Sequence, residues 1–322
     1  MANLKTLASR FFAPVFYLAL VVGAFFYLRN IKWNEVHLDQ LNWSWVGLAV
    51  ILALVQRYWY SFIWMFLLQR LGAQIGHLRF ELAAVYAKSW LGRYIPGGVT
   101  WILGKIYFAN KLGVSATKLG VSSFLEGVLQ IISILISAVI LLAFDPKIQA
   151  IGWWVIPALI LAALIGLVSV YPPIFNRVLQ FGYRKMRKTD IDSESLPNLA
   201  TILRGLVAFS VTSVLSGMQV FCIAAAIDPH LSLVNVFFVI GISNFFSAAS
   251  MLAVFAPAGL GVQELMAVFL AFVMVSPAAA ALTVVLLRLF SIILDVLFLG
   301  SAMGARAMFS RAKNFGETPE SR

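Results

Sequence analysis

The chain has 322 residues, of which 61% are hydrophobic and only 11% are charged, and its mean hydropathy is +0.93. This composition excludes a soluble globular domain and predicts an all-α polytopic membrane protein. The formal net charge of +11 lies mostly between apolar segments, where lysine and arginine orient spans and attract anionic lipids, so we expect no nucleic-acid partner. A single cysteine and three scattered histidines predict no disulfide, no metal site and no cofactor.

Six apolar stretches are long enough to cross a bilayer, because a helix needs about 20 residues to span about 30 Å of hydrocarbon. They cover about residues 11–28, 43–69, 115–143, 151–170, 200–227 and 278–304. The first lacks a small-residue cleavage site and is interpreted as a retained span rather than a signal peptide. The polar tail, 305–322, is expected to be frayed and cytoplasmic.

Two further apolar segments, at about 81–109 and 233–275, are broken by proline and glycine. Proline removes a backbone donor, glycine does not favour helix, and hydrocarbon offers no water to replace the lost hydrogen bonds. Such a break is stable at membrane depth only where protein covers it or a wet cavity adjoins it. The arms of the first segment are too short to cross, so we predict two re-entrant hairpins. In the second, 233–256 is alternatively long enough for a full crossing.

The distribution of lysine and arginine predicts the orientation. Counted by loop, sixteen fall on one side and three (Arg29, Lys32 and Lys147) on the other, which predicts an inner-membrane protein with both termini cytoplasmic. The basic segment 171–199 carries apolar residues at helical spacing. It is expected to lie on the inner membrane surface, or else to be a plain positive-inside loop.

Both halves of the chain show the same order of segments: an uncharged span, a span with polar residues, a hairpin broken by proline and glycine, and a second span with polar residues. Because the hairpins would enter from opposite sides, this order predicts an inverted repeat of residues 1–149 and 150–304. The alternative is a chance recurrence of Pro-Gly breaks in a glycine-rich membrane protein.

Ionisable residues inside apolar segments are the candidate functional residues. Each costs about 2.5–3.5 kcal/mol at the bilayer centre, so it must face a cavity or another charge. One interpretation is structural, with Arg288 paired to Glu126 or Glu264. The other is a site in which cations bind a lipid phosphate, since a guanidinium bonds two phosphate oxygens at once. The cations of that site are Arg57, Arg93, Lys105 and Arg288.

The two breaks add backbone donors to this site. A half-helix that begins after Pro96-Gly97-Gly98, beside Thr100, directs free N–H groups and the positive end of its dipole at the turn. The second turn, with Pro257, Gly259 and Gly261, repeats this arrangement, and Glu264 follows it. Glu264 either caps the second arm or acts with Glu126 in gating or proton coupling.

At these turns the sequence resembles the transmembrane region of lysylphosphatidylglycerol synthases, also called the flippase-like domain family. The resemblance is carried by Tyr94-Ile95-Pro96-Gly97-Gly98-Val99 and Ala256-Pro257-Ala258-Gly259-Leu260-Gly261-Val262-Gln263-Glu264, and it covers nearly the whole chain. Ala258 stands where a second glycine is common in the family. The resemblance implies movement of lipids with modified or phosphorylated headgroups between leaflets. Members that synthesise the aminoacyl lipid carry an additional soluble domain that this sequence lacks, so lysyl transfer is not expected.

The sequence therefore predicts a lipid translocase for an aminoacyl-phospholipid or a polyprenyl-phosphate-linked sugar, and not an enzyme. One alternative is a membrane-embedded transferase that uses a lipid phosphate, with Glu126 or Glu264 as base. Another is a secondary transporter of small solutes. The expected partners are membrane lipids with anionic headgroups, and the sequence leaves room for a homo-oligomer.

Overall fold

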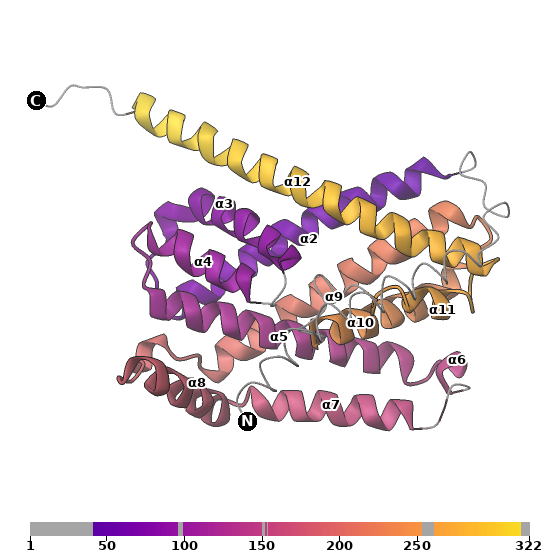
Figure 1. The fold of residues 1–322 in the computed structure, drawn as a ribbon, viewed down its shortest axis with the longest axis horizontal. Helices are drawn as coiled ribbons and strands as arrows, with labels where there is room; N and C mark the ends of the chain where they lie inside the picture. Colours follow the sequence, from indigo (N-terminus) through magenta and orange to yellow (C-terminus); the bar gives the residue numbers. More distant parts are fainter. Residues whose placement is uncertain (1–40, 96–98, 150–151, 153, 253–260, 317–322) are drawn as a thin grey trace, which may run out of the picture.

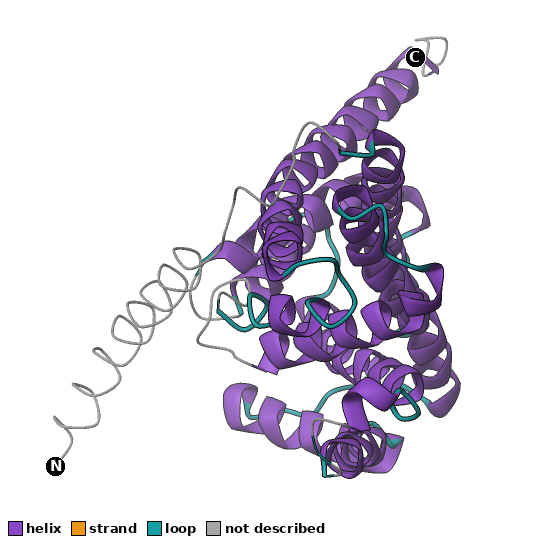
Figure 2. Cartoon of the chain, turned by 90° about the vertical axis from the view of Figure 1, so that its right-hand side faces the viewer, coloured by secondary structure: helices purple, strands orange, loops and turns teal. Residues whose placement is uncertain are grey.

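The computed structural model describes residues 41–95, 99–149, 152, 154–252 and 261–316, which fold into a helical bundle (Figure 1). None of these residues lies in a strand, as the side view also shows (Figure 2). Five described helices are long and apolar enough to cross a membrane, or six if a bent pair counts as one span. The predicted fold class, an all-α polytopic membrane protein, is confirmed. The predicted span at 11–28 lies outside the described residues.

Five long helices build the bundle, and their bounds follow the apolar stretches of the sequence. Both α2 and α9 begin at an asparagine cap: the side chain of Asn42 accepts from the Ser44 N–H, and that of Asn198 from the Thr201 N–H. The five helices are α2 (Trp43–Arg70), α5 (Ala116–Leu142), α9 (Leu199–Ile227), α10 (Val236–Leu252) and α12 (Pro277–Gly316).

Helix α12 is longer than the sequence predicts. We expected a frayed tail from residue 305, but the helix continues to Gly316 because residues 305–315 include no proline or glycine and several strong helix formers. Its 40 residues measure about 60 Å, more than the thickness of a bilayer with its headgroups. The C-terminal end of α12 therefore projects beyond the other helices (Figure 1).

The first broken segment forms two short helices, as predicted. Helix α3 (Arg79–Trp90) continues into η4 (Leu91–Tyr94), and α4 (Thr100–Asn110) packs back against both. The turn residues Pro96, Gly97 and Gly98 lie outside the described residues. Gly92 permits the close approach, since a Cβ there would stand 2.9 Å from the backbone nitrogen of Trp101.

The second broken segment is asymmetric. Together, η6 (Leu233–Asn235) and α10 are long enough to cross the membrane, whereas α11 (Met266–Leu270) has a single turn. This matches the alternative of a spanning first arm. The turn with Pro257 and Gly259, 253–260, lies outside the described residues.

A bent pair of helices follows the middle of the chain. Helix α7 (Val155–Ser169) turns by 70° into α8 (Pro172–Arg187). On α8, Phe175 is buried, while Ile174, Val178 and Phe181 are exposed at helical spacing, as expected for a helix on a membrane surface. Beyond its end, a hydrogen bond from Arg184 lowers the pKa of Asp190. The remaining short elements are η3 (Gly76–Leu78), α6 (Pro146–Gln149) and η5 (Ser193–Ser195).

The halves pack crosswise rather than side by side. Helix α2 lies along α9, α3 packs against α12, and α10 packs against α5. Each broken segment thus contacts the last long helix of the other half as well as its own, through α4 on α5 and α11 on α12. One apolar core surrounds Trp64 and Tyr86, and a second surrounds Phe221 and Phe238.

Candidate functional site

A cavity of about 580 Å³ lies where the two halves meet. Residues from both halves line it, on α2, α3, η4, α4, α5, α9, α10, α11 and α12. Three of the described lining residues are arginines, and none of the described lining residues is a lysine, histidine, aspartate or glutamate. Its polar lining consists of Arg57, Arg93, Arg288, Gln56, Gln130, Gln219, Gln263, Ser123, Ser213, Ser216, Ser243, Ser247, Ser250 and Ser291.

Asp295 on α12 holds two of these arginines. Arg57 donates to its Oδ1 through Nε at 2.8 Å, and Arg93 donates to its Oδ2 through Nη2 at 2.6 Å. Tyr94 Oη and Trp90 Nε1 donate to the same carboxylate at 2.7 and 3.1 Å. This carboxylate is fully buried and neutralises one of the two positive charges beside it.

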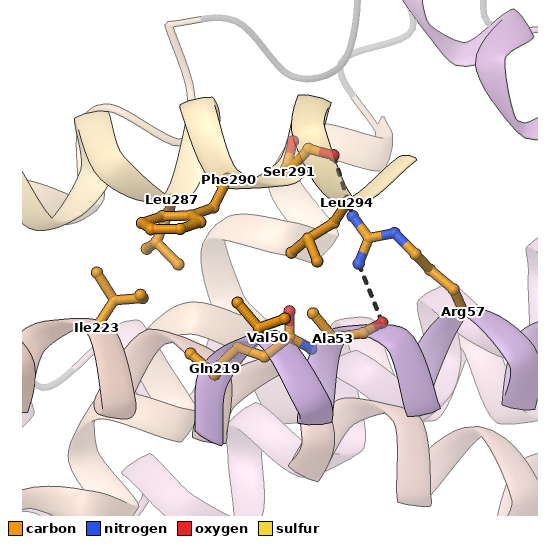
Figure 3. A pocket seen from close by; sticks show the side chains of 10 residues that line it. Val50, Ala53, Arg57, Gln219, Ile223, Leu287, Phe290, Ser291 and Leu294 are labelled. Atoms are coloured by element: carbon orange, nitrogen blue, oxygen red, sulfur yellow. Dashed lines mark hydrogen bonds between the residues drawn. The ribbon is translucent and has the colours of Figure 1, made fainter. Parts of the chain in front are cut away.

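Each of the three guanidinium nitrogens of Arg57 donates a hydrogen bond. Its Nη1 donates to the Ala53 carbonyl at 3.1 Å and its Nη2 to the Ser291 carbonyl at 3.2 Å, so the guanidinium bridges α2 and α12 (Figure 3). A small pocket of about 30 Å³ adjoins it, lined also by Gln219 and Phe290 (Figure 3). That volume suits a water molecule.

Arg93 is the more available cation. Its side chain is 27% exposed, against 6% for Arg57, and its Nε has no hydrogen-bond partner among the described residues. The guanidinium carbon lies 4.7 Å from the centre of the Trp90 ring, which is within cation–π range. Because Arg93 sits on η4 beside the break at 96–98, the fold of the first hairpin places it at the cavity.

Arg288 pairs with Glu264, which is one of the two partners expected from sequence. Arg288 Nε lies 3.0 Å from Glu264 Oε1, and Glu264 Oε2 accepts from the Gly261 N–H at 2.5 Å. Gly261 has a φ of +86°, which favours glycine. Glu264 therefore caps the turn before α11 and links it to α12 at the same time.

Lys105 and Glu126 pair with each other, not with the arginines. Both are buried; Lys105 Nζ donates to Glu126, whose other oxygen accepts from Tyr86 Oη at 2.6 Å. Lys105 Nζ also lies 4.1 Å from the centre of the Trp101 ring. Trp101 lines the cavity, whereas Lys105 and Glu126 do not, and neither does Thr100 at the start of α4. This ion pair is therefore buried behind the residues that line the cavity, whereas the arginines are part of that lining.

The sequence marks Asp295 as an ionisable residue inside an apolar segment but does not assign it to the site. The available signal is a carboxylate within the last apolar span, where an unpaired charge is costly. Its partners could not be read from the sequence, because they come from α2 and η4, more than 200 residues away.

The fold and the cavity define a class: a multi-pass helical membrane protein with an arginine-lined polar cavity between its halves. The sequence profile of the family described as "Lysylphosphatidylglycerol synthase TM region" matches residues 12–298, so the chain belongs to this family. A search of curated proteins finds none that matches the sequence.

Proposed function

We propose that the chain is a lipid translocase that moves a lipid with an anionic headgroup between leaflets. The observation that carries this proposal is the 580 Å³ cavity with Arg57, Arg93 and Arg288 on its lining, inside a bundle of membrane-spanning helices. Arginine is well suited to phosphate because its planar fork bonds two oxygens. The headgroup would enter the cavity while the acyl or prenyl tails stay in lipid.

Arg93 is the residue expected to exchange partners during transport. In the structure one of its nitrogens bonds Asp295, and its Nε is unpartnered among the described residues. A phosphate could therefore approach the exposed part of the Arg93 side chain and compete with Asp295 for the guanidinium, and the buried Nε could donate to it once the side chain has turned. Arg57, held by Asp295 and two backbone carbonyls, would remain in place and supply fixed positive potential.

The crosswise packing supports an inverted repeat of residues 1–149 and 150–304. Helix α3 packs on α12 in the way that α10 packs on α5, and α2 lies along α9. An ion pair joins each broken segment to the next long helix, with opposite polarity: Lys105 to Glu126 in one half and Glu264 to Arg288 in the other. Inverted repeats with broken helices at their interface are common in transporters. Three statements stay predictions: that the protein lies in the inner membrane, that both termini are cytoplasmic, and that it forms a homo-oligomer.

The contacts of the carboxylates favour transport over group transfer. A transferase would need a base facing its substrate, but Glu126 is engaged by Lys105 and Tyr86, and Glu264 by Gly261 and Arg288. A small-solute transporter would need a cavity closed to lipid. Ile95 and Phe124 line the cavity and are each more than a third exposed, which favours a lateral opening.

Purified protein in liposomes tests the proposal. A phospholipid with a fluorophore on its acyl chain is quenched in the outer leaflet by dithionite, which does not cross the bilayer. We expect near-complete quenching with the protein and quenching of the outer leaflet alone without it. Equal quenching with and without protein, for phosphatidylglycerol and for a polyprenyl-phosphate sugar, would contradict the proposal.

A further inference from the structure

We infer that the cavity selects a headgroup with a single phosphodiester charge and an uncharged, hydroxyl-rich terminal group, such as glycerol, inositol or a sugar. The inference rests on the proposed function and narrows its substrate class. It disfavours headgroups that carry an amine, which include the aminoacyl-phospholipids, and headgroups that carry two negative charges.

The charges beside the cavity do not cancel. Three guanidiniums reach the cavity, and two carboxylates, Asp295 and Glu264, neutralise them in the described part of the chain. One positive charge is therefore left, and it matches one phosphodiester. An ammonium group would meet this excess charge with no described carboxylate on the lining to bind it. The ion pair of Lys105 and Glu126, behind Trp101, adds no net charge.

Five serine hydroxyls from two adjacent helices lie on the lining of the cavity. Ser243, Ser247 and Ser250 stand at positions i, i+4 and i+7 of α10, so they share one face of that helix, and all three line the cavity. Ser213 and Ser216 line it from α9, against which α10 packs. Ser213 and Ser250 donate to backbone carbonyls of their own helices and can still accept, and serine hydroxyls in general both donate and accept, which suits a ligand whose own groups are hydroxyls.

One buried hydroxyl at the cavity has no hydrogen-bond partner in the described part of the chain. The Ser123 hydroxyl on α5 lines the cavity, its side chain is completely buried, and it has no partner among the described residues. Buried polar groups are nearly always hydrogen-bonded in native proteins, so an unpartnered one at a cavity points to a ligand or to water. The buried Nε of Arg93 likewise has no partner among the described residues, so a phosphate bearing a polyol has two donors to satisfy there once these side chains turn toward it.

Headgroup competition in liposomes tests the inference. Three acyl-labelled lipids with the same tails are compared: phosphatidylglycerol, phosphatidylethanolamine and phosphatidic acid. Since a site built to hydrogen-bond its ligand rejects analogues without the matching groups, we expect phosphatidylglycerol to exchange about tenfold faster than the other two. Unlabelled polyprenyl-phosphate hexose, added as competitor, shows whether the preferred polyol belongs to a phospholipid or to an isoprenoid lipid.

Matched variants link the preference to the serines. Ser123→Ala with Ser247→Ala is expected to slow the exchange of phosphatidylglycerol more than that of phosphatidylethanolamine, and so to reduce the preference for phosphatidylglycerol. Ser210→Ala, on an exposed face of α9 and absent from the lining, is the control. Equal exchange of all three lipids, or an unchanged preference in the double variant, would overturn the inference and leave the proposed function standing. No exchange of any lipid would overturn both.

Discussion

Arg57 on α2 and Asp295 on α12 form a buried ion pair across 238 residues of sequence, with Nε and Oδ1 2.8 Å apart. The pair joins the first described long helix to the last. Because Arg93 binds the other oxygen of the same carboxylate, Asp295 ties the first hairpin to this junction as well. Asp295 thus helps to position α12 against the first half of the chain, together with contacts such as the hydrogen bond from Tyr58 to Ser301.

Removal of that carboxylate should destabilise the protein strongly. Asp295→Asn leaves two buried or half-buried guanidiniums without a counter-charge, and we expect a loss of about 3–5 kcal/mol in unfolding free energy. Thermal unfolding in detergent measures the effect. Asp145→Asn is the control, since among the described residues Asp145 forms an ion pair with the part-exposed Lys147 at 3.7 Å, and asparagine keeps the acceptor for the Lys147 N–H. Equal melting of the two variants would show that the Asp295 network is not structural.

The two arginines on Asp295 should differ in function. Arg93→Gln is expected to abolish most lipid exchange and to lower stability little, because Arg93 is partly exposed and makes one bond to the carboxylate. Arg57→Gln removes bonds to Asp295, Ala53 and Ser291 and should lower both exchange and stability. Exchange and melting temperature are measured on the same preparations. If Arg93→Gln exchanges lipid at the native rate, Arg93 does not bind the headgroup.

The pair of Lys105 and Glu126 should matter for folding and not for transport. Lys105→Met leaves a buried carboxylate unpaired and is expected to cost about 3–5 kcal/mol. The double variant Lys105→Met/Glu126→Gln removes both charges and keeps an acceptor for Tyr86, so it should recover most of the stability and exchange lipid normally. A stable double variant without exchange would show that this pair takes part in transport after all.

Because α9 and α10 pack closely, replacement of Gly217 should lower the stability of the protein. A Cβ on Gly217 would stand 2.6 Å from the Cα of Ile240, so Gly217→Ala must push the helices apart at a cost of about 1–3 kcal/mol. A Cβ on Gly47 of α2 would meet nothing within 4 Å, and Gly47→Ala should stabilise its helix by up to about 1 kcal/mol. Thermal unfolding that ranks the variants in the other order would contradict the packing of α9 on α10.

Glu264 sets the charge of the cavity in this account. Glu264→Gln leaves Arg288 without its carboxylate and raises the net charge beside the cavity by one. Exchange of phosphatidic acid, which carries more negative charge than phosphatidylglycerol, should therefore rise relative to that of phosphatidylglycerol. Both rates come from the same liposome preparation. An unchanged ratio would show that Glu264 does not tune the charge of the cavity.

The sequence predicts the helices well because apolar length and proline-glycine breaks determine them directly. The boundaries of α2, α5 and α9 agree with the stretches 43–69, 115–143 and 200–227 to within one residue. The ends of α10 and the C-terminal end of α12 are predicted less accurately, since the position of a break and the fraying of a polar end depend on local helix propensity.

The partners of the buried charges are much harder to predict. Glu126 and Arg288 occupy nearly equivalent places after their prolines, yet each bonds a residue of the preceding broken segment and not the other. Equal depth in the membrane does not bring two side chains into contact; rotation and packing of the helices decide that. The Asp295 network also depends on α3 packing against α12, which no local pattern encodes.

Cysteine accessibility in the membrane tests most directly whether a polar, lipid-binding cavity exists at the centre of the bundle. In a Cys222→Ala background, Ser247→Cys on the cavity lining is compared with Val207→Cys on the exposed apolar face of α9, using a charged, water-soluble thiol reagent. We expect rapid labelling at 247, slow labelling at 207, and protection of 247 alone when phosphatidylglycerol is present. Equally slow labelling at both positions, or labelling at 247 that no anionic lipid affects, would contradict the account.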